Sequence, residues 1–158
     1  MTTEAMNDAF GKPVDRHAVA RAASAAMWAD DNATQALGMT IVQSGPGTAT
    51  LTMPVVKTMT NGHGMCHGGY IFTLADSAFA FACNSHNTKT VAQHCAVTFL
   101  APAQLGDVLT ATAREINRAG RSGITDVTVA NQAGETIAVF RGHSRTLGGA
   151  ITPDHPAL

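Results

Sequence analysis

One acidic residue, Asp76, lies inside a strongly apolar stretch and therefore needs a chemical explanation. Between positions 71 and 82 the only other polar side chains are those of Thr73 and Ser77. An ionised carboxylate among apolar groups carries a desolvation cost unless a partner or a catalytic role compensates for it. A structural explanation remains open, in which backbone donors or a side chain of a neighbouring subunit bind the carboxylate. We favour a functional carboxylate.

Two glycines, Gly68 and Gly69, precede this stretch and predict a place where a substrate can approach the backbone closely. If a helix begins there, its free N–H groups and positive dipole end suit a developing oxyanion. Gly69 and Asp76 are seven residues apart in the sequence. On a helix they share nearly one face but are separated by about 10 Å along the axis. A single Asp side chain cannot span that distance. We therefore expect two helices to pack antiparallel about a two-fold axis, so that Asp76 of one subunit faces Gly68 of the other.

A second group of candidate binding residues lies in the turn at residues 117–123 and consists of Arg118, Gly120, Arg121 and Ser122. Two guanidinium groups beside exposed amides suit a phosphate-bearing ligand. A solvated hairpin turn is the alternative. Ten Lys and Arg against eleven Asp and Glu give a net charge of −1. No block of like charge is present, so we expect no nucleic-acid or membrane-surface partner, and an anionic ligand must be met locally.

Other chemistries find less support in the sequence. Histidines and cysteines gather in two places, His63, Cys66 and His67, then Cys83, His86, His94 and Cys95. Zinc sites usually use paired ligands at regular spacing, and no complete set is present, so we expect no metal. We interpret His67 as a residue that orders the start of the helix. The Gly-rich segment lacks the Gly-Lys-Ser/Thr ending of a P-loop. A serine nucleophile is also disfavoured, because no Gly-x-Ser-x-Gly elbow is present.

The elements that must position Asp76 follow from hydrophobic periodicity. Residues 70–83 are apolar on all sides, which is typical of a buried helix. Six β-rich runs surround it, namely 39–42, 48–53, 91–100, 108–117, 124–131 and 136–147. Their connections are too short for parallel crossovers. We therefore expect an α+β fold, in which an antiparallel sheet of five or six strands wraps around one long buried helix. An Ala-rich stretch at 18–28 predicts a short additional helix near the N-terminus.

The length of 158 residues fits one domain, which we place at residues 18–147. Residues 1–17 are predicted to be a flexible leader, and residues 148–158, with two prolines, a flexible tail. Three cysteines in apolar or Gly-rich surroundings are typical of reduced thiols, so we expect a cytoplasmic protein. No apolar run reaches the length of a membrane span, and we expect no membrane association.

A family resemblance rests on the central segment. The stretch Asn61-Gly-His-Gly-Met-Cys-His-Gly-Gly-Tyr-Ile-Phe-Thr-Leu-Ala-Asp76, with Ala-Phe-Ala-Phe-Ala-Cys-Asn84 after it, closely resembles hotdog-fold acyl-CoA thioesterases of the phenylacetic-acid-degradation (PaaI-type) branch. Three further motifs look like the same branch: Thr98-Phe-Leu-Ala-Pro102, Gly106-Asp107 and Phe140-Arg-Gly-His-Ser144. The likeness extends over residues 37–149.

The resemblance implies a hotdog fold and the hydrolysis of an aryl- or arylacetyl-CoA thioester without a cofactor. It further implies a homotetramer built from two hotdog dimers. In this family the residue at the Asp76 position is the general base or nucleophile, and the backbone amide at the Gly68 position polarises the thioester carbonyl. Asn61 and His67 match the positions that assist orientation. The long leader and the segment His63-Gly-Met65 depart from the family pattern and leave the acyl group undetermined.

Two functions from other classes remain as alternatives. A hotdog enoyl-thioester hydratase or dehydratase would share the fold, but it normally uses a paired acid and base. No second carboxylate accompanies Asp76 in the helix. A non-catalytic acyl-CoA-binding protein could keep the arginine turn, but it would need no carboxylate in a buried helix.

Overall fold

A computed structural model of the chain describes residue 7 and residues 12–158. Most of the predicted leader therefore lies outside the described residues. The first helix, α1 (Arg16–Asp30), begins two residues before the predicted start of the domain. Its start is set by Asp15, whose carboxylate accepts hydrogen bonds from the backbone N–H groups of His17 and Ala18. This side chain satisfies donors that the first helical turn leaves unpaired.

Six strands form one antiparallel sheet in the order β1-β2-β4-β5-β6-β3. Their bounds are β1 Thr40–Gly45, β2 Thr48–Pro54, β3 Thr90–Phe99, β4 Val108–Ala119, β5 Ser122–Ala130 and β6 Thr136–Thr146. The long hairpins β4–β5 and β5–β6 join sequential neighbours, whereas β3 joins the sheet beyond β6. The sequence-based prediction of a mostly antiparallel sheet of five or six strands is confirmed.

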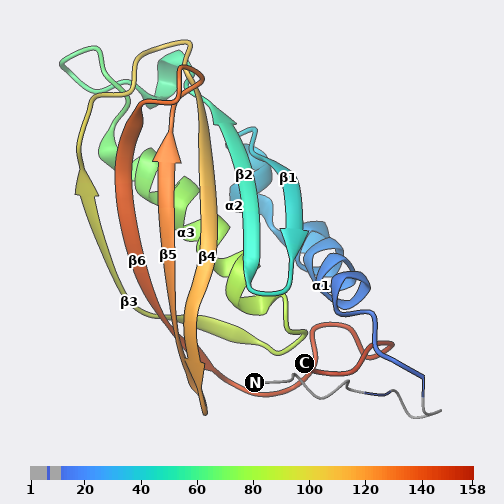
Figure 1. The fold of residues 1–158 in the computed structure, drawn as a ribbon. Helices are drawn as coiled ribbons and strands as arrows, with labels where there is room; N and C mark the ends of the chain where they lie inside the picture. The colour runs from blue at the N-terminus through green and yellow to red at the C-terminus, as the bar shows by residue number, and fades with distance from the viewer. Residues whose placement is uncertain (1–6, 8–11) are drawn as a thin grey trace.

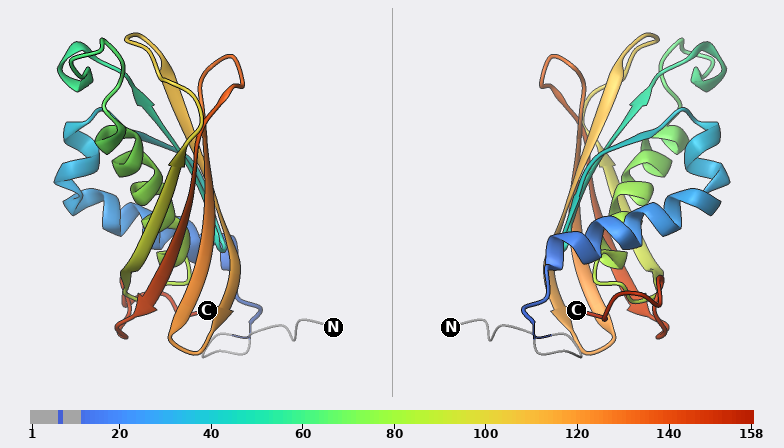
Figure 2. Two further views of the ribbon diagram at one scale, coloured as in Figure 1. Left: turned by 90° about the vertical axis from the view of Figure 1, so that its left-hand side faces the viewer. Right: turned by 90° about the vertical axis from the view of Figure 1, so that its right-hand side faces the viewer.

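Helix α3 (Gly68–Asn84) lies across the concave face of this sheet, and the strands curve around it (Figures 1 and 2). Its apolar side chains form the centre of the core together with the inward residues of β2, β4, β5 and β6. On β2 the inward residues Ala49, Leu51 and Met53 are buried and alternate with more exposed threonines. This alternation of period two is expected of a strand with one face on the core.

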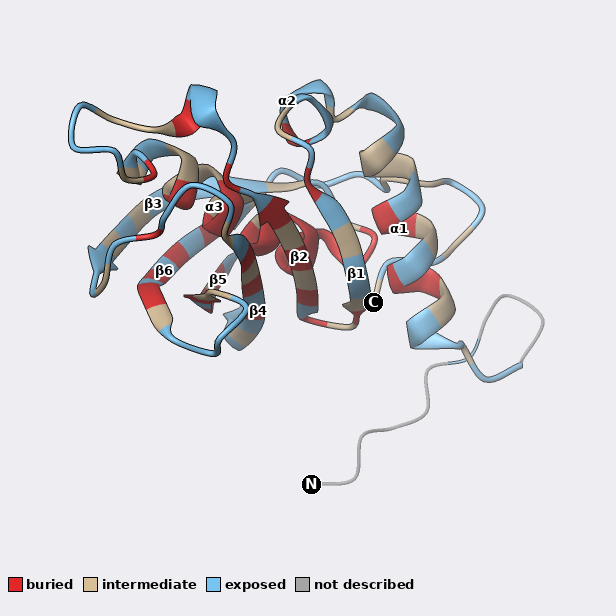
Figure 3. Cartoon of the chain, turned by 90° about the horizontal axis from the view of Figure 1, so that it is seen from above, coloured by how far each residue is buried: buried red, intermediate tan, exposed pale blue. Residues whose placement is uncertain are grey.

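Helix α2 (Asn32–Ala36) lies beside α3, and the short 3₁₀ helix η1 (Lys57–Met59) lies at the upper end of the molecule in the view of Figure 1. Helix α1 packs against β1 and buries a stripe that includes Val19, Ala20 and Ala23 (Figure 3). Within the described part of the chain, no helix is both long and apolar enough to cross a membrane.

Strand β3 is an edge strand that hydrogen-bonds only to β6 within the sheet. Three large apolar side chains are exposed at this edge, those of Val91 and Phe99 on β3 and of Leu100 directly after it. The opposite edge strand, β1, has α1 packed beside it. An open edge of this kind is normally covered or paired with another chain.

Residues 151–158, at the end of the chain, are hydrogen-bonded to the loop that follows α3. The buried Asn87 side chain donates to the carbonyl oxygens of Thr152 and His155 and accepts from the N–H groups of Ile151 and Thr152. Leu158 N donates to His86 O. The two prolines exclude regular structure, but Asn87 supplies the hydrogen bonds that a helix or strand would otherwise provide.

Candidate active site

The N-terminus of α3 is open at Gly68. The His67 side chain caps the helix, since its Nδ1 accepts the Gly69 N–H at 2.9 Å. An imidazole that accepts at Nδ1 carries its proton on Nε2, which remains a donor. Within the described part of the chain, no hydrogen bond of the Gly68 N–H is found. A Cβ at position 68 would lie 2.8 Å from Cζ of Phe99, so only glycine fits under this ring without displacing it.

Asp76 lies two turns further along α3 and is half-buried. Its Oδ1 accepts a hydrogen bond from Sγ of Cys95 on β3, with 3.8 Å between the two atoms. Burial raises the pKa of the Asp76 carboxyl above its usual range, while the Cys95 hydrogen bond acts in the opposite direction. A base whose pKa is raised toward the working pH is better suited to proton transfer than an ordinary surface aspartate.

The Gly68 and Asp76 positions open into different grooves of the single chain. Gly68 lines a groove of ≈ 510 Å³ with Cys66, Ile71 and the segment from Phe99 to Ala103. Asp76 lines another, of ≈ 660 Å³, between α1, the C-terminal half of α3 and the start of β3. No residue is common to the two linings. The separation agrees with the two helical turns expected from the sequence.

Asn61 and the loop after it precede the open helix end. The Asn61 side-chain oxygen accepts from the N–H groups of His63 at 2.9 Å and Met65 at 3.3 Å. Its backbone N–H donates to Met65 O, which closes the loop. Cys66 N then donates to Ala103 O, so the loop is joined to the segment after β3. Asn61 thus orders the segment that leads into His67 and Gly68.

The arginine turn between β4 and β5 lies at the opposite end of α3 from Gly68 (Figure 1). Arg118 Nη2 donates to Leu158 O at 2.7 Å, and Arg121 Nε donates to Thr146 O at 3.0 Å. Gly120 has a positive φ of 58°, and Gly120, Arg121 and Ser122 are exposed. Within one chain, the structure does not bring this turn to the open helix end, but both guanidinium groups remain exposed.

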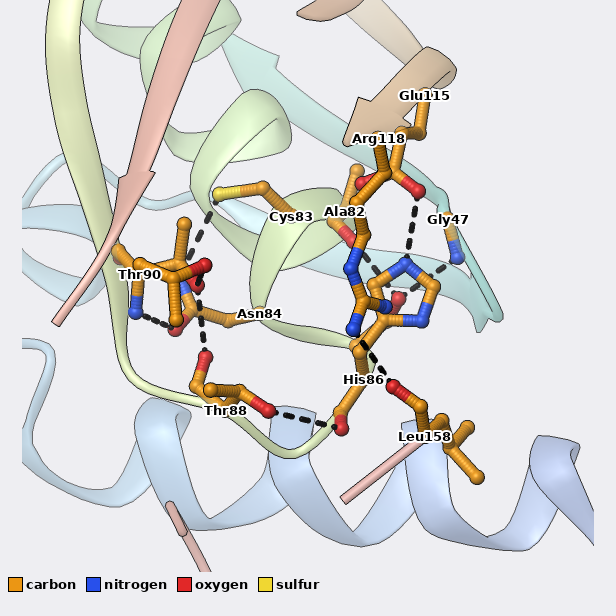
Figure 4. A network of polar contacts seen from close by, with 12 residues as sticks. Gly47, Ala82, Cys83, Asn84, His86, Thr88, Thr90, Glu115, Arg118 and Leu158 are labelled. Carbon is orange, nitrogen blue, oxygen red and sulfur yellow. Dashed lines mark hydrogen bonds and ion pairs between the residues drawn. The ribbon is translucent and has the colours of Figure 1, made fainter. Parts of the chain in front are cut away.

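A buried polar cluster closes the C-terminal end of α3 (Figure 4). His86 Nε2 lies 2.9 Å from Oε1 of Glu115, and both side chains are largely buried. Ser85 Oγ donates to Ala82 O and accepts from Gly47 N. Its hydroxyl proton is therefore not directed to His86, as that of a serine nucleophile would be. This arrangement does not support a catalytic triad at Ser85 and His86. The partnership with Glu115 was not predicted, because 29 residues separate the two side chains.

Two further observations concern ligands and thiols. Among the described residues, no group of three or more His, Cys, Asp or Glu side chains is arranged to hold a metal ion. The three cysteines, Cys66, Cys83 and Cys95, are free thiols. From the sequence, Cys95 was expected to be a reduced thiol and was weighed as a metal ligand, but its contact with Asp76 was not predicted. The spacing along the chain contains no signal for a contact between a helix and a later strand.

Comparison with known proteins places this arrangement in a wider group. A profile of the thioesterase superfamily matches residues 63–138, which include Gly68 and Asp76. The acyl-coenzyme A thioesterase PaaI of Escherichia coli is 46% identical over 127 residues, covering 80% of this chain and 91% of that protein. Human acyl-coenzyme A thioesterase 13 is 33% identical over 113 residues, covering 70% of this chain and 80% of that protein.

Solved structures agree with the sequence matches. The E. coli PaaI protein from the phenylacetic acid degradation operon superposes with a TM-score of 0.85 at 42% identity, covering 86% of this chain and 99% of that chain. A Streptococcus mutans protein bound to acetyl-CoA superposes with a TM-score of 0.69 at 28% identity, covering 71% of this chain and 90% of that chain. The expected hotdog architecture is confirmed by these superpositions.

Proposed function

This chain belongs to the thioesterase superfamily, and from that premise we propose that it is an acyl-CoA thioesterase. Its substrate is the thioester of an aryl- or arylacetyl-CoA, which it hydrolyses to the free acid and CoA. The relative named PaaI and its operon support this acyl class. The observation that carries the proposal is the half-buried Asp76 on α3, which faces a groove and has a raised pKa.

The reaction needs little beyond placement and charge stabilisation, because a thiolate is already a good leaving group. The thioester carbonyl oxygen accepts the Gly68 N–H, and the positive end of α3 stabilises the negative charge that develops during attack. Asp76 either deprotonates a water molecule or attacks the carbonyl carbon directly. Nε2 of His67 is a donor next to this position and orients the carbonyl. No cofactor takes part.

Two chains supply one site in this proposal. Gly68 and Asp76 of one chain open into separate grooves and are about 12 Å apart along the axis of α3, which is too far for one thioester carbonyl to contact both. Pairing of the open edge of β3 with the same strand of a second copy would bring two α3 helices side by side in antiparallel orientation. Each Asp76 then faces the partner's helix start, and two equivalent sites result. The exposed apolar side chains at β3 support this interface, and a tetramer of two such dimers is the proposed assembly.

The phosphates of CoA are proposed to bind at the arginine turn. Arg118 and Arg121 each use one N–H group for a carbonyl oxygen of the chain and keep further donors of the guanidinium fork for an anion. Gly120 and Ser122 expose backbone and hydroxyl donors beside them. The Streptococcus mutans protein that binds acetyl-CoA supports the same ligand class.

Because its three cysteines are free thiols, the protein is proposed to act in the cytoplasm.

A hydratase or dehydratase of the same fold is the second candidate, but no separate observation favours it. Asp30, the other acidic residue that lines the Asp76 groove, is exposed on α1 and does not pair with the carboxylate. A binding protein without activity would not explain a carboxylate that costs free energy to bury.

One assay separates the three functions. The protein is incubated in parallel with phenylacetyl-CoA, an enoyl-CoA and a long-chain acyl-CoA, while thiol release and hydration of the double bond are followed. Thiol release that is fastest with phenylacetyl-CoA is the expected result. Hydration without thiol release would support the hydratase, and tight binding without either product would support the binding protein.

A further inference from the structure

Cys95 contacts Asp76, and the mechanism above does not use it. Its Sγ lies 3.8 Å from Oδ1, and this is the one hydrogen bond of the Asp76 carboxylate among the described residues. We propose that Cys95 is a positioning residue, whose S–H group holds Oδ1 and leaves Oδ2 of Asp76 as the oxygen that reacts. The inference rests on the proposed function in one respect, namely that Asp76 is the catalytic carboxylate.

The local structure of β3 directs Cys95 toward the helix. An irregularity of register between Ala92 and His94 places Gln93 as an extra residue in β3. Such a bulge changes which side chains face the core. After it, Cys95 and Val97 are half-buried and pack against the core, whereas His94 and Ala96 are exposed.

The neighbouring strand brings α3 close enough for the contact. Cys95 pairs with Gly142 of β6. A Cβ at position 142 would lie 2.5 Å from Cδ2 of Phe79, so the absence of a side chain lets the Phe79 ring press against the strand. Phe79 is three residues after Asp76, on an adjacent part of the same helix face. The bulge and the glycine together fix the distance between Sγ and the carboxylate.

The thiol is suited to this role because it stays protonated. Burial raises the pKa of Cys95 to about 11, and the nearby Asp76 charge acts in the same direction. At neutral pH the side chain is therefore an S–H donor rather than a thiolate nucleophile. A thiol is a weak donor, so it favours one orientation and the ionised form of Asp76 without holding the carboxylate so strongly that its basicity is lost.

A direct test follows the ionisation of Asp76 by carbon NMR of its carboxyl group in the full-length protein. Removal of the donor in Cys95→Ala is expected to raise the Asp76 pKa by roughly half a unit to one unit, the size of one net hydrogen bond. Cys95→Ser keeps a donor and should restore much of the wild-type value. Val97→Ala is the matched control, because it removes volume from the same face of β3 but takes away no hydrogen-bond donor of Asp76.

The other titratable groups that line the Asp76 groove, Asp30, Cys83 and Lys89, are unchanged in all these variants. Hydrolysis should report the same shift. The acid limb of the kcat/KM profile moves to higher pH in Cys95→Ala, and kcat at neutral pH falls about threefold to tenfold with little change in KM.

The hydrolysis assay tests the proposed function, and the NMR titration of Asp76 tests the role of Cys95 separately. If the wild-type protein released no thiol from any acyl-CoA, the proposed function would be wrong, while the NMR titration would still show whether Cys95 acts on Asp76. An unchanged Asp76 titration in folded Cys95→Ala, or an equal shift in Val97→Ala, would overturn the positioning role.

Discussion

The two ends of α3 differ in how far their backbone and polar groups are hydrogen-bonded to other segments. At the N-terminal end, consecutive glycines leave the backbone accessible, and the N–H of Gly68 has no hydrogen bond within the described residues. At the C-terminal end, nearly every polar side chain is tied to another segment. Asn84 both donates to Thr90 O and accepts from Thr90 N, which joins the helix to β3. Asn87 holds the end of the chain in the same manner.

This difference shows how one helix can serve stability and chemistry at once. The C-terminal end is anchored to β1–β2, to β3, to β4 and to the tail through Ser85, Asn84, His86 and Asn87. Because that end is fixed, the helix can keep an unsatisfied donor at its start and a partly desolvated carboxylate at its middle without losing its orientation. Sites that bind substrate commonly depart from the rules that stabilise the rest of a fold.

The largest expected effect comes from the part of α3 that carries the chemistry, in Asp76→Asn at the middle of the helix. Loss of the base or nucleophile should lower thioester turnover at least about a hundredfold. The melting temperature should stay the same or rise, because a neutral amide costs less to bury than the carboxylate. Activity assays and thermal unfolding of the same preparation provide both values. Near-full activity in a folded variant would contradict the mechanism.

The pH dependence of the wild-type enzyme belongs to the same carboxylate. Because burial raises the Asp76 pKa, the reactive ionised form is present above that raised value and is lost as pH falls through it. For stability the sign is reversed, because protonation relieves the cost of a buried charge and the folded state gains from it as pH falls. The acid limb of kcat/KM should disappear from the residual activity of Asp76→Asn.

Gly68→Val tests the open end itself and should lower kcat about a hundredfold to a thousandfold, as expected on losing an oxyanion donor. The new side chain would collide with Phe99 and block approach to the amide.

If two chains form each site, mixing this variant with Asp76→Asn should restore about half of the wild-type activity per mixed dimer, since one of its two sites receives neither change. Subunit exchange is verified by tagging one variant. Mixed dimers as inactive as both parents would place the site within one chain.

At the anchored end, Asn87→Ala should change stability rather than chemistry. The variant loses the hydrogen bonds to residues 151–156 and keeps a positive φ of 57° that alanine tolerates poorly. We expect the free energy of unfolding to fall by about 2 to 4 kcal/mol, measured by urea denaturation. Asn87→Gly is the matched control, because it removes the same side chain but relieves φ, so its loss should be smaller. Equal stability of wild type and Asn87→Ala would show that the tail contact contributes nothing.

The smallest effect is expected at the arginine turn, which lies beyond the anchored end. Arg118→Gln or Arg121→Gln should raise KM about threefold to tenfold and change kcat less, because phosphate binding is equal in the ground and transition states. Arg16→Gln removes the same charge from α1 and should leave KM unchanged. If KM is also unchanged in the double variant of the turn, the phosphates bind elsewhere.

Local patterns in the sequence predicted much of the fold. The all-apolar run around Asp76 indicated a buried helix, and α3 spans Gly68–Asn84. Alternation at Ala49, Leu51 and Met53 indicated a strand with one inward face, which is also found. Both predictions succeed because burial acts on residues close together in the sequence, at the period of the element itself. The hydrogen bonds between Asn87 and residues 151–156 were not predicted, since the prolines there indicate a lack of regular structure but not the side chain that binds this segment.

The sequence by itself determined that Asp76 lies on a buried helix two turns from a glycine-opened start, because helical spacing is a property of the backbone. It also determined the family, through the motif from Asn61 to Asp76. Only the tertiary structure decided that Cys95 faces Asp76, that His86 pairs with Glu115 and that Asn87 binds the tail. These contacts join segments 19, 29 and 64 residues apart, and their partners are set by strand order, a β-bulge and the close approach of Phe79 to Gly142. No local periodicity carries that information, because it arises only when the sheet closes around the helix.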